Sequence, residues 1–79
     1  MWCVYVLRSQ KDRHRYVGMT TDVVQRLHEH NAGKVRSTKD RRPFELIYQE
    51  SNYTCTQARE REKILKSVAG RRYLDEKIG

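Results

Sequence analysis

An unbroken run of β-prone residues, from Trp2 to Leu7, constrains this chain more than any other feature. No charged residue interrupts the run, so it predicts a central strand that is covered on both faces. The chain has 79 residues, and a chain of this length buries only about 60% of the surface that its unfolded form exposes. We therefore expect one domain over residues 1–79, built from one thin sheet with helices packed on it, and a shallow site.

The remaining segments carry strand and helix signals in turn. Tyr53-Thr54-x-x-Gln57 is a capping box preceded by a hydrophobic residue, which predicts a helix that begins at Thr54. Thr20 or Thr21 can cap an earlier helix that has Asp22 in its first turn. The predicted elements are strands at 2–7, 15–19 and 44–49, a helix from 22 to a stop at 31–33, a helix from 54 to 69 ended by Gly70, and a last helix from 71 that buries Leu74 and Ile78.

The first predicted helix combines an apolar stripe with two basic side chains. Its buried stripe is predicted to consist of Val23, Val24 and Leu27. Arg26 and His30 are four residues apart, so they lie together along one edge of that stripe and face the rim of the sheet. Gly18, at the end of the second predicted strand, favours a bulge or a close approach of another group.

The second predicted helix carries a carboxylate at the margin of its apolar face. That face is formed by Ala58, Leu65, Val68 and Ala69, and Glu62 lies one turn from both Ala58 and Leu65. A carboxylate in that position is costly unless a cation meets it. Helix geometry alone leaves two interpretations open: an ion pair with Lys66, Arg61 or Arg26, and a metal ligand.

Charge favours a polyanionic partner. Lys and Arg number 17 against 10 Asp and Glu, which gives a formal net charge of +7, and phosphate backbones bind such chains by releasing counterions. One stretch, in which apolar residues show no clear period, predicts a basic surface loop that would contact nucleic acid. Its basic residues are Lys34, Arg36, Lys39, Arg41 and Arg42. No basic segment has the wide apolar face of a helix that lies on a membrane.

Other classes of protein are excluded by what the chain lacks. The longest apolar run, 1–7, is far below the roughly 20 residues that span a bilayer, and no basic segment precedes it, so a cytoplasmic location is expected. Cys3 and Cys55 form neither a disulfide framework nor a Cys/His ligand cluster. His28 and His30 would point in nearly opposite directions on a helix, so a zinc site is not expected.

Four segments in order resemble a known pattern. Cys3-Val4-Tyr5, Tyr16-Val17-Gly18, Val23-x-x-Arg26-Leu27-x-x-His30-Asn31 and Ala58-x-x-Arg61-Glu62-x-x-Leu65-Lys66 together are similar to the GIY-YIG nuclease superfamily, and more narrowly to its compact single-domain bacterial members. The segment Ser37-Thr38-x-x-Arg41-Arg42-Pro43-Phe44-x-Leu46-x-Tyr48 matches the usual linker and third strand. The resemblance implies an α/β fold in which a small central three-stranded antiparallel sheet is flanked by helices.

The same resemblance implies the hydrolysis of phosphodiester bonds, most often in DNA and in processes such as repair, with one divalent metal. By position, Tyr5, Tyr16 and Arg26 match catalytic residues and Glu62 matches the metal ligand, while His30 is an auxiliary residue that contacts phosphate. Mg²⁺, or Mn²⁺ in its place, suits a single carboxylate because it keeps much of its hydration. An arginine matches the shape and charge of phosphate and stabilises the transition state.

The tyrosines allow two assignments, and the chain allows more than one function. Either Tyr5 helps to deprotonate the attacking water while Tyr16 orients it, or the roles are exchanged. The alternative to a nuclease is a nucleic-acid-binding module that cleaves slowly or not at all and is recruited by a protein partner. A module whose basic loop binds an acidic protein is a third interpretation. Larger members carry a late asparagine and further domains, and no asparagine follows Asn52 here, so the choice of substrate is open.

Overall fold

The computed structural model describes residues 1–78. Its sheet is three-stranded and antiparallel with the order β2-β1-β3, so the first strand is central, as predicted. The expected fold class is confirmed. The elements are β1 (Trp2–Ser9), β2 (Arg15–Thr20), α1 (Val23–Asn31), the 3-10 helix η1 (Lys39–Arg41), β3 (Phe44–Tyr53), α2 (Cys55–Lys66) and α3 (Val68–Ile78).

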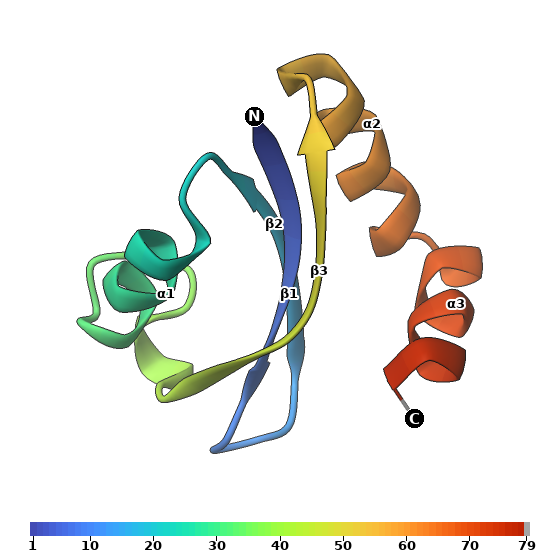
Figure 1. The fold of residues 1–79 in the computed structure, drawn as a ribbon. Helices are drawn as coiled ribbons and strands as arrows, with labels where there is room; N and C mark the ends of the chain where they lie inside the picture. Colours follow the sequence, from blue (N-terminus) through green and yellow to red (C-terminus); the bar gives the residue numbers. More distant parts are fainter. Residues whose placement is uncertain (79) are drawn as a thin grey trace.

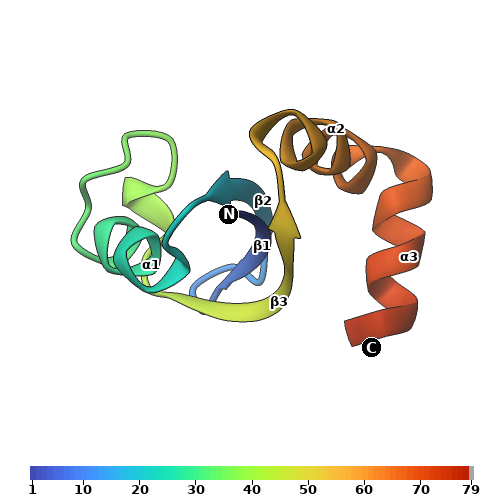
Figure 2. The ribbon, with the colours of Figure 1, turned by 45° about the horizontal axis from the view of Figure 1, so that its top comes forward.

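Helices cover both faces of the sheet, which explains the unbroken run of β1. Figures 1 and 2 show α1 and the loop after it on one side of the sheet, and α2 and α3 on the other. Val4 and Val6 point toward α2 and α3, and both side chains are completely buried. Tyr5 and Leu7 point toward α1 and are buried as well. Burial of alternate residues on opposite faces is the arrangement that an uninterrupted run predicts.

The start and the buried face of α1 differ in detail from the prediction. Asp22, rather than Thr20 or Thr21, caps the helix, because its carboxylate accepts a hydrogen bond from the Gln25 amide at 3.0 Å. The Thr20 hydroxyl instead accepts one from the Asp22 amide. Val23 is buried as predicted, but Val24 is 71% exposed, so its assignment to the stripe is wrong. Successive helix positions differ by about 100° in direction, so Val24 turns away, whereas Leu27 packs against the same cluster as Val23, as predicted.

The C-terminal helices divide at a different residue from the one predicted. The Thr54–Gln57 capping box is present, which confirms the predicted start of α2. That helix ends at Lys66, and α3 begins before Gly70, so Gly70 does not end a helix. A Cβ at Gly70 would lie 2.0 Å from the carbonyl oxygen of Ile64, so only glycine lets α3 approach the end of α2 this closely.

The break between α2 and α3 also redistributes the apolar residues. Val68 is 69% exposed and Ala69 is exposed, so neither shares the buried face of Ala58 and Leu65 as predicted. Leu74 is buried against that face, as predicted, and Ile78 packs at its edge. In place of a continuous stripe on one helix, α3 adds Leu74, with Tyr73 and Ile78 partly buried, to the core that Ala58 and Leu65 form with β1.

A polar cluster on the side of β3 that α2 and α3 cover ties these helices to the strand. Glu50 accepts hydrogen bonds from Tyr48 at 2.5 Å and from Tyr53 at 2.7 Å. Arg61 of α2 donates to both oxygens of Glu50, at 2.7 and 3.0 Å, and its guanidinium lies 4.9 Å from the centre of the Tyr73 ring of α3. The cluster links β3, α2 and α3 through one largely buried carboxylate. Within residues 1–78, no helix is long and apolar enough to cross a membrane.

Candidate active site

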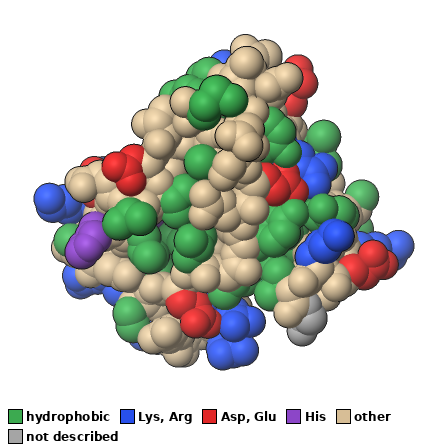
Figure 3. Space-filling view, in the orientation of Figure 1, with side chains coloured by type: hydrophobic (Ala, Val, Ile, Leu, Met, Phe, Trp, Pro, Cys, Tyr) green, Lys and Arg blue, Asp and Glu red, His purple; other side chains and the backbone are tan. Residues whose placement is uncertain are grey.

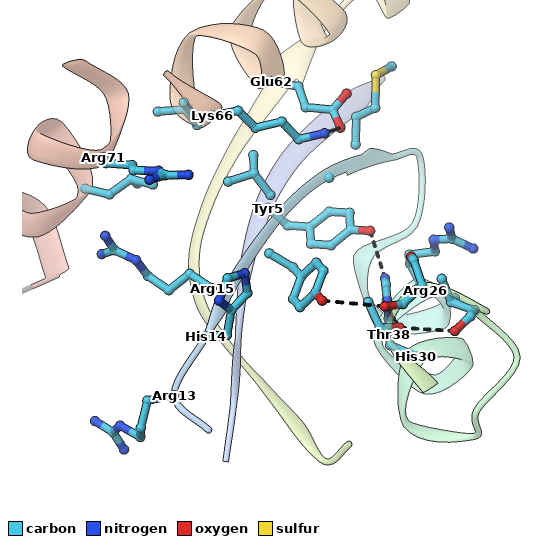
Figure 4. Close-up of a pocket in the computed structure, with 18 residues that line it drawn as sticks. Tyr5, Arg13, His14, Arg15, Arg26, His30, Thr38, Glu62, Lys66 and Arg71 are labelled. Atoms are coloured by element: carbon cyan, nitrogen blue, oxygen red, sulfur yellow. Dashed lines mark hydrogen bonds and ion pairs between the residues drawn. The ribbon is translucent and has the colours of Figure 1, made fainter. Parts of the chain in front are cut away.

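An open cleft of about 790 Å³ extends around β2, the strand at one edge of the sheet. Every residue that the sequence predicted as catalytic or metal-binding lines it: Tyr5, Tyr16, Arg26, His30 and Glu62. These side chains come from β1, β2, α1 and α2. Because α1 and α2 cover opposite faces of the sheet, their side chains can meet only around its edge. Figure 4 shows Glu62 on one side of Tyr5, and Arg26 and His30 on the other.

Gly18 makes room for the tyrosine of the central strand. It lies opposite Tyr5 in the β1–β2 register, and a Cβ at this position would be 2.4 Å from the Tyr5 hydroxyl oxygen. The absent side chain lets the tyrosine ring lie over the edge strand with its hydroxyl in the cleft. The close approach predicted at Gly18 is thus an approach of the Tyr5 ring.

The Tyr5 hydroxyl begins a chain of buried hydrogen bonds. It lies 3.1 Å from Nε2 of His30, whose Nδ1 lies 2.8 Å from the hydroxyl oxygen of Thr38. The Thr38 hydroxyl donates in turn to the carbonyl oxygen of Val35 at 3.4 Å. His30 is 4% and Thr38 1% exposed, so water does not compete for these contacts. Sequence reasoning placed His30 at the rim but missed Thr38, because nothing in its spacing shows that the loop folds back over α1.

The number of protons on His30 and Thr38 determines which group donates in each of these hydrogen bonds. Burial, and then the charge of Arg26, lower the pKa of His30 below its usual 6.5, so its ring is neutral near pH 7 and carries one proton. Thr38 donates to Val35, so its oxygen accepts from Nδ1–H, and Nε2 is left to accept from Tyr5. Burial raises the pKa of Tyr5 above 10, although Arg26 opposes this effect. Near pH 7, Tyr5 is therefore a phenol that donates to His30.

Arg26 and Tyr16 complete the α1 end of the cleft. The Arg26 guanidinium donates to Glu29 at 3.1 Å, and its interactions with the Tyr5 hydroxyl and Glu29 raise its pKa further, so it stays charged. Its side chain is 38% exposed and can reach an anion in the cleft. The Tyr16 hydroxyl donates to the backbone oxygen of Ser37 at 3.5 Å, and its ring packs edge-on against Phe44. The two tyrosines thus have different partners, a histidine nitrogen and a backbone carbonyl.

Glu62 is paired at the other end of the cleft. Its carboxylate lies 3.0 Å from Nζ of Lys66, which confirms the ion pair proposed from helix geometry and selects Lys66 among the candidates. Arg61 binds Glu50 instead. The Glu62 side chain is 20% exposed whereas that of Lys66 is 57% exposed, so the lysine can move into solvent without disturbing the helix. No group of three or more His, Cys, Asp or Glu able to hold a metal occurs within residues 1–78.

This donor set fits one kind of divalent site. Glu62 is the only acidic residue among those that line the described cleft. A single carboxylate suits a hard cation that keeps its waters and takes further oxygens from a bound phosphate, as Mg²⁺ does. It does not suit a cation that needs a closed set of protein ligands. The assignment of Glu62 as a metal ligand stays a prediction.

The basic residues of the cleft are not those of the predicted basic loop. None of the five loop residues lines the cleft, and part of that loop is used internally: Arg41 pairs with Asp12 at 3.5 Å and Arg42 donates to the Lys39 carbonyl at 2.8 Å. Contact of the loop with nucleic acid stays a prediction. Besides Arg26, the basic side chains that line the cleft are Arg13, Arg15, Lys66 and Arg71. Sequence reasoning missed them as a group because they come from a turn, a strand and two helices.

Comparisons with known proteins agree with this geometry. The family model of the GIY-YIG catalytic domain matches residues 1–74. UPF0213 protein SH2523 of Staphylococcus haemolyticus is 42% identical over 67 residues, which cover 84% of this chain and 80% of that protein. UPF0213 protein YazA of Bacillus subtilis is 39% identical over 77 residues, which cover 92% of this chain and 77% of that protein. No solved structure matches the chain. A match over nearly the whole chain, with the matched residues gathered in one cleft, shows that the chain belongs to the GIY-YIG catalytic domain family.

Proposed function

We propose that this chain is a divalent-metal-dependent endonuclease that hydrolyses phosphodiester bonds, with DNA as its preferred substrate. The observation that carries the proposal is the convergence of Tyr5, Arg26, His30 and Glu62 on one open cleft. A domain that only binds nucleic acid has no use for a carboxylate in that cleft, because the carboxylate repels phosphate unless a cation bridges them.

In the proposed reaction, Tyr5 acts on the attacking water through His30. The water oxygen forms the new bond to phosphorus as its proton passes to the Tyr5 oxygen, and the Tyr5 proton passes to Nε2 of His30. The bond from phosphorus to the leaving oxygen breaks, and that oxygen takes a proton from solvent. A phenol with a raised pKa needs such an acceptor, and His30 is the one in contact with it at 3.1 Å. We assign the base to Tyr5 rather than Tyr16 for this reason.

The other residues stabilise and orient the phosphate. Arg26 stays charged and offers its guanidinium to the phosphate oxygens, where negative charge increases in the transition state. Tyr16, held by Ser37, orients the phosphate or the water. Mg²⁺ or Mn²⁺ bound at Glu62 would polarise the phosphate and shield the leaving oxygen.

The test compares cleavage by the parent and by matched variants. Labelled supercoiled plasmid, single-stranded DNA and RNA are incubated with Mg²⁺, Mn²⁺ or EDTA. We expect metal-dependent cleavage that Glu62→Gln loses and that Tyr5→Phe lowers by about 100-fold or more. Glu60→Gln is the control, because Glu60 is exposed on the same helix and does not line the cleft. Binding without cleavage in any metal would contradict the proposal and favour a binding module recruited by a protein partner.

A further inference from the structure

The cleft continues beyond the catalytic residues along a second group of basic side chains. Arg13 and Arg15 come from the turn and strand that follow β1, and Arg71 comes from the first turns of α3. Figure 4 shows Arg13, Arg15 and Arg71 on the side of the cleft away from Arg26 and His30. We name these three residues the basic arm. Tyr5 and Tyr16 line the same cleft, and Figure 4 shows Arg15 and Arg71 nearer to Tyr5 than Arg13.

Electrostatics in the cleft favours a polyanion over a single small anion. Its lining contains Arg13, Arg15, Arg26, Lys66 and Arg71 and only one acidic residue, Glu62, which Lys66 neutralises. Arg15 and Arg26 are paired with Asp75 and Glu29, which lie outside that lining, so the unpaired positive charge of the described lining rests on Arg13 and Arg71, at separate points of the cleft. A chain of phosphates can contact a series of separate cations, and each contact releases counterions.

Two residues of the basic arm carry a charge that no acidic side chain within residues 1–78 neutralises. Within residues 1–78, Arg13 and Arg71 take part in no ion pair, whereas Arg15 binds Asp75 at 2.7 Å and so fixes α3 beside β2. The side chains of Arg13 and Arg71 are exposed. On the face shown in Figure 3, by contrast, Lys and Arg side chains are scattered and several adjoin acidic ones. Two unpaired arginines in the cleft that also holds the catalytic residues are suited to bind phosphate groups of a ligand that extends along it.

We infer that the basic arm, and not the loop of residues 34–42, holds the phosphate backbone of the substrate next to the bond that is cleaved. Arg13 and Arg71 contact phosphates of the flanking strand, and Arg15 positions α3 so that Arg71 reaches them. The inference rests on the proposed function, because that function sets the scissile phosphate beside Arg26. The arm recognises phosphate and does not contact bases, so it contributes affinity and placement but no sequence preference.

The experiment compares three double variants that remove equal charge. Arg13→Gln/Arg71→Gln changes the basic arm. Lys34→Gln/Arg36→Gln changes the loop. Lys11→Gln/Arg72→Gln changes neighbours of Arg13 and Arg71 that do not line the cleft. Binding of labelled single-stranded and duplex DNA in EDTA is measured against salt concentration by fluorescence anisotropy, and circular dichroism checks the fold of each variant.

The expected result is specific to the arm variant. Two lost phosphate contacts reduce the slope of log K against log salt by about 1.4 for single strands and weaken binding about 10-fold near 0.15 M salt. The other two variants keep the parent slope. Equal losses in all three variants, a loss confined to the loop variant, or no binding by the parent overturns the inference.

Cleavage separates this inference from the proposed function. If the parent cleaves and the arm variant both binds and cleaves like the parent, the inference fails while the proposed function stands. If the parent binds but never cleaves, the proposed function fails, and the salt slopes still decide whether the arm binds phosphate.

Discussion

Removal of the Glu50 charge should lower the free energy of unfolding near neutral pH, and most of the difference from the parent protein should disappear in acid. Hydrogen bonds from Arg61 lower the pKa of Glu50 from 4.5 to about 2, and those from Tyr48 and Tyr53 act in the same direction. A shift of about 2.5 units corresponds to about 3 kcal/mol of stability, since one unit is worth about 1.36 kcal/mol. The side chain is only 14% exposed, so solvent screens this interaction little.

The sign follows from the lowered pKa. A carboxyl that ionises more readily in the folded state stabilises the fold fully above about pH 5, and this stabilisation is lost as the pH falls through 4.5 to about 2. Glu50→Gln should therefore lower the free energy of unfolding by about 3 kcal/mol at pH 7. With an m-value of about 1 kcal/mol/M, the urea midpoint falls by about 3 M.

Urea unfolding of the parent and of Glu50→Gln at a series of pH values measures this effect. Glu45→Gln is the control, because Glu45 lies on the same strand and pairs with Arg8 at 2.9 Å but is 41% exposed. It should cost less than about 1 kcal/mol. The parent should lose stability between pH 5 and pH 2, and Glu50→Gln should lose much less. Parallel losses in both proteins would refute the reasoning.

Two further substitutions test the hydrogen bonds that link Tyr5, His30 and Thr38. Gly18→Ala places a Cβ 2.4 Å from the Tyr5 hydroxyl oxygen, so it should cost about 1–3 kcal/mol in thermal unfolding and abolish cleavage; an alanine variant that cleaves at the parent rate contradicts the packing argument. Thr38→Val leaves Nδ1–H of His30 without its acceptor, so it should cost about 1–3 kcal/mol and lower the cleavage rate, whereas Thr38→Ser restores both. Equal rates for the valine and serine variants would show that Thr38 acts only by packing.

The elements that the sequence predicted well are those with strong local signals. The run at the start of the chain is apolar on both sides of its pleat, and the capping box at Thr54 satisfies backbone groups that no other residue nearby can satisfy. The length of β3 was underestimated. Its pairing with β1 continues to Tyr53 after a shift in register. In that last part of the strand, apolar and polar residues no longer alternate, so the sequence gives no strand signal there.

Tertiary contact explains two of the differences from the prediction, whereas the cap and the buried face of α1 differ for local reasons of helix geometry. Gly70 has the sequence context of a helix stop, and only the close approach of α3 to Ile64 explains its place within a helix. Thr38 stands in the linker segment of the family pattern, but its role was missed because it depends on a loop that returns to His30. The cleft residues of the family pattern were predicted because the pattern records which distant positions meet, which local propensity does not.

The position of the cleft at β2 limits how the sheet can associate with other chains. Tyr5 reaches the cleft from the face that α1 covers, and Glu62 reaches it from the face that α2 covers, so the residues meet only where the sheet ends. A strand paired with the free side of β2 would extend the sheet through this meeting point and separate the two faces. The free side of β3 is the other edge, and it lies across β1 from the cleft. Pairing there leaves the cleft open, so only the β3 edge is compatible with strand addition by a partner that does not block the site.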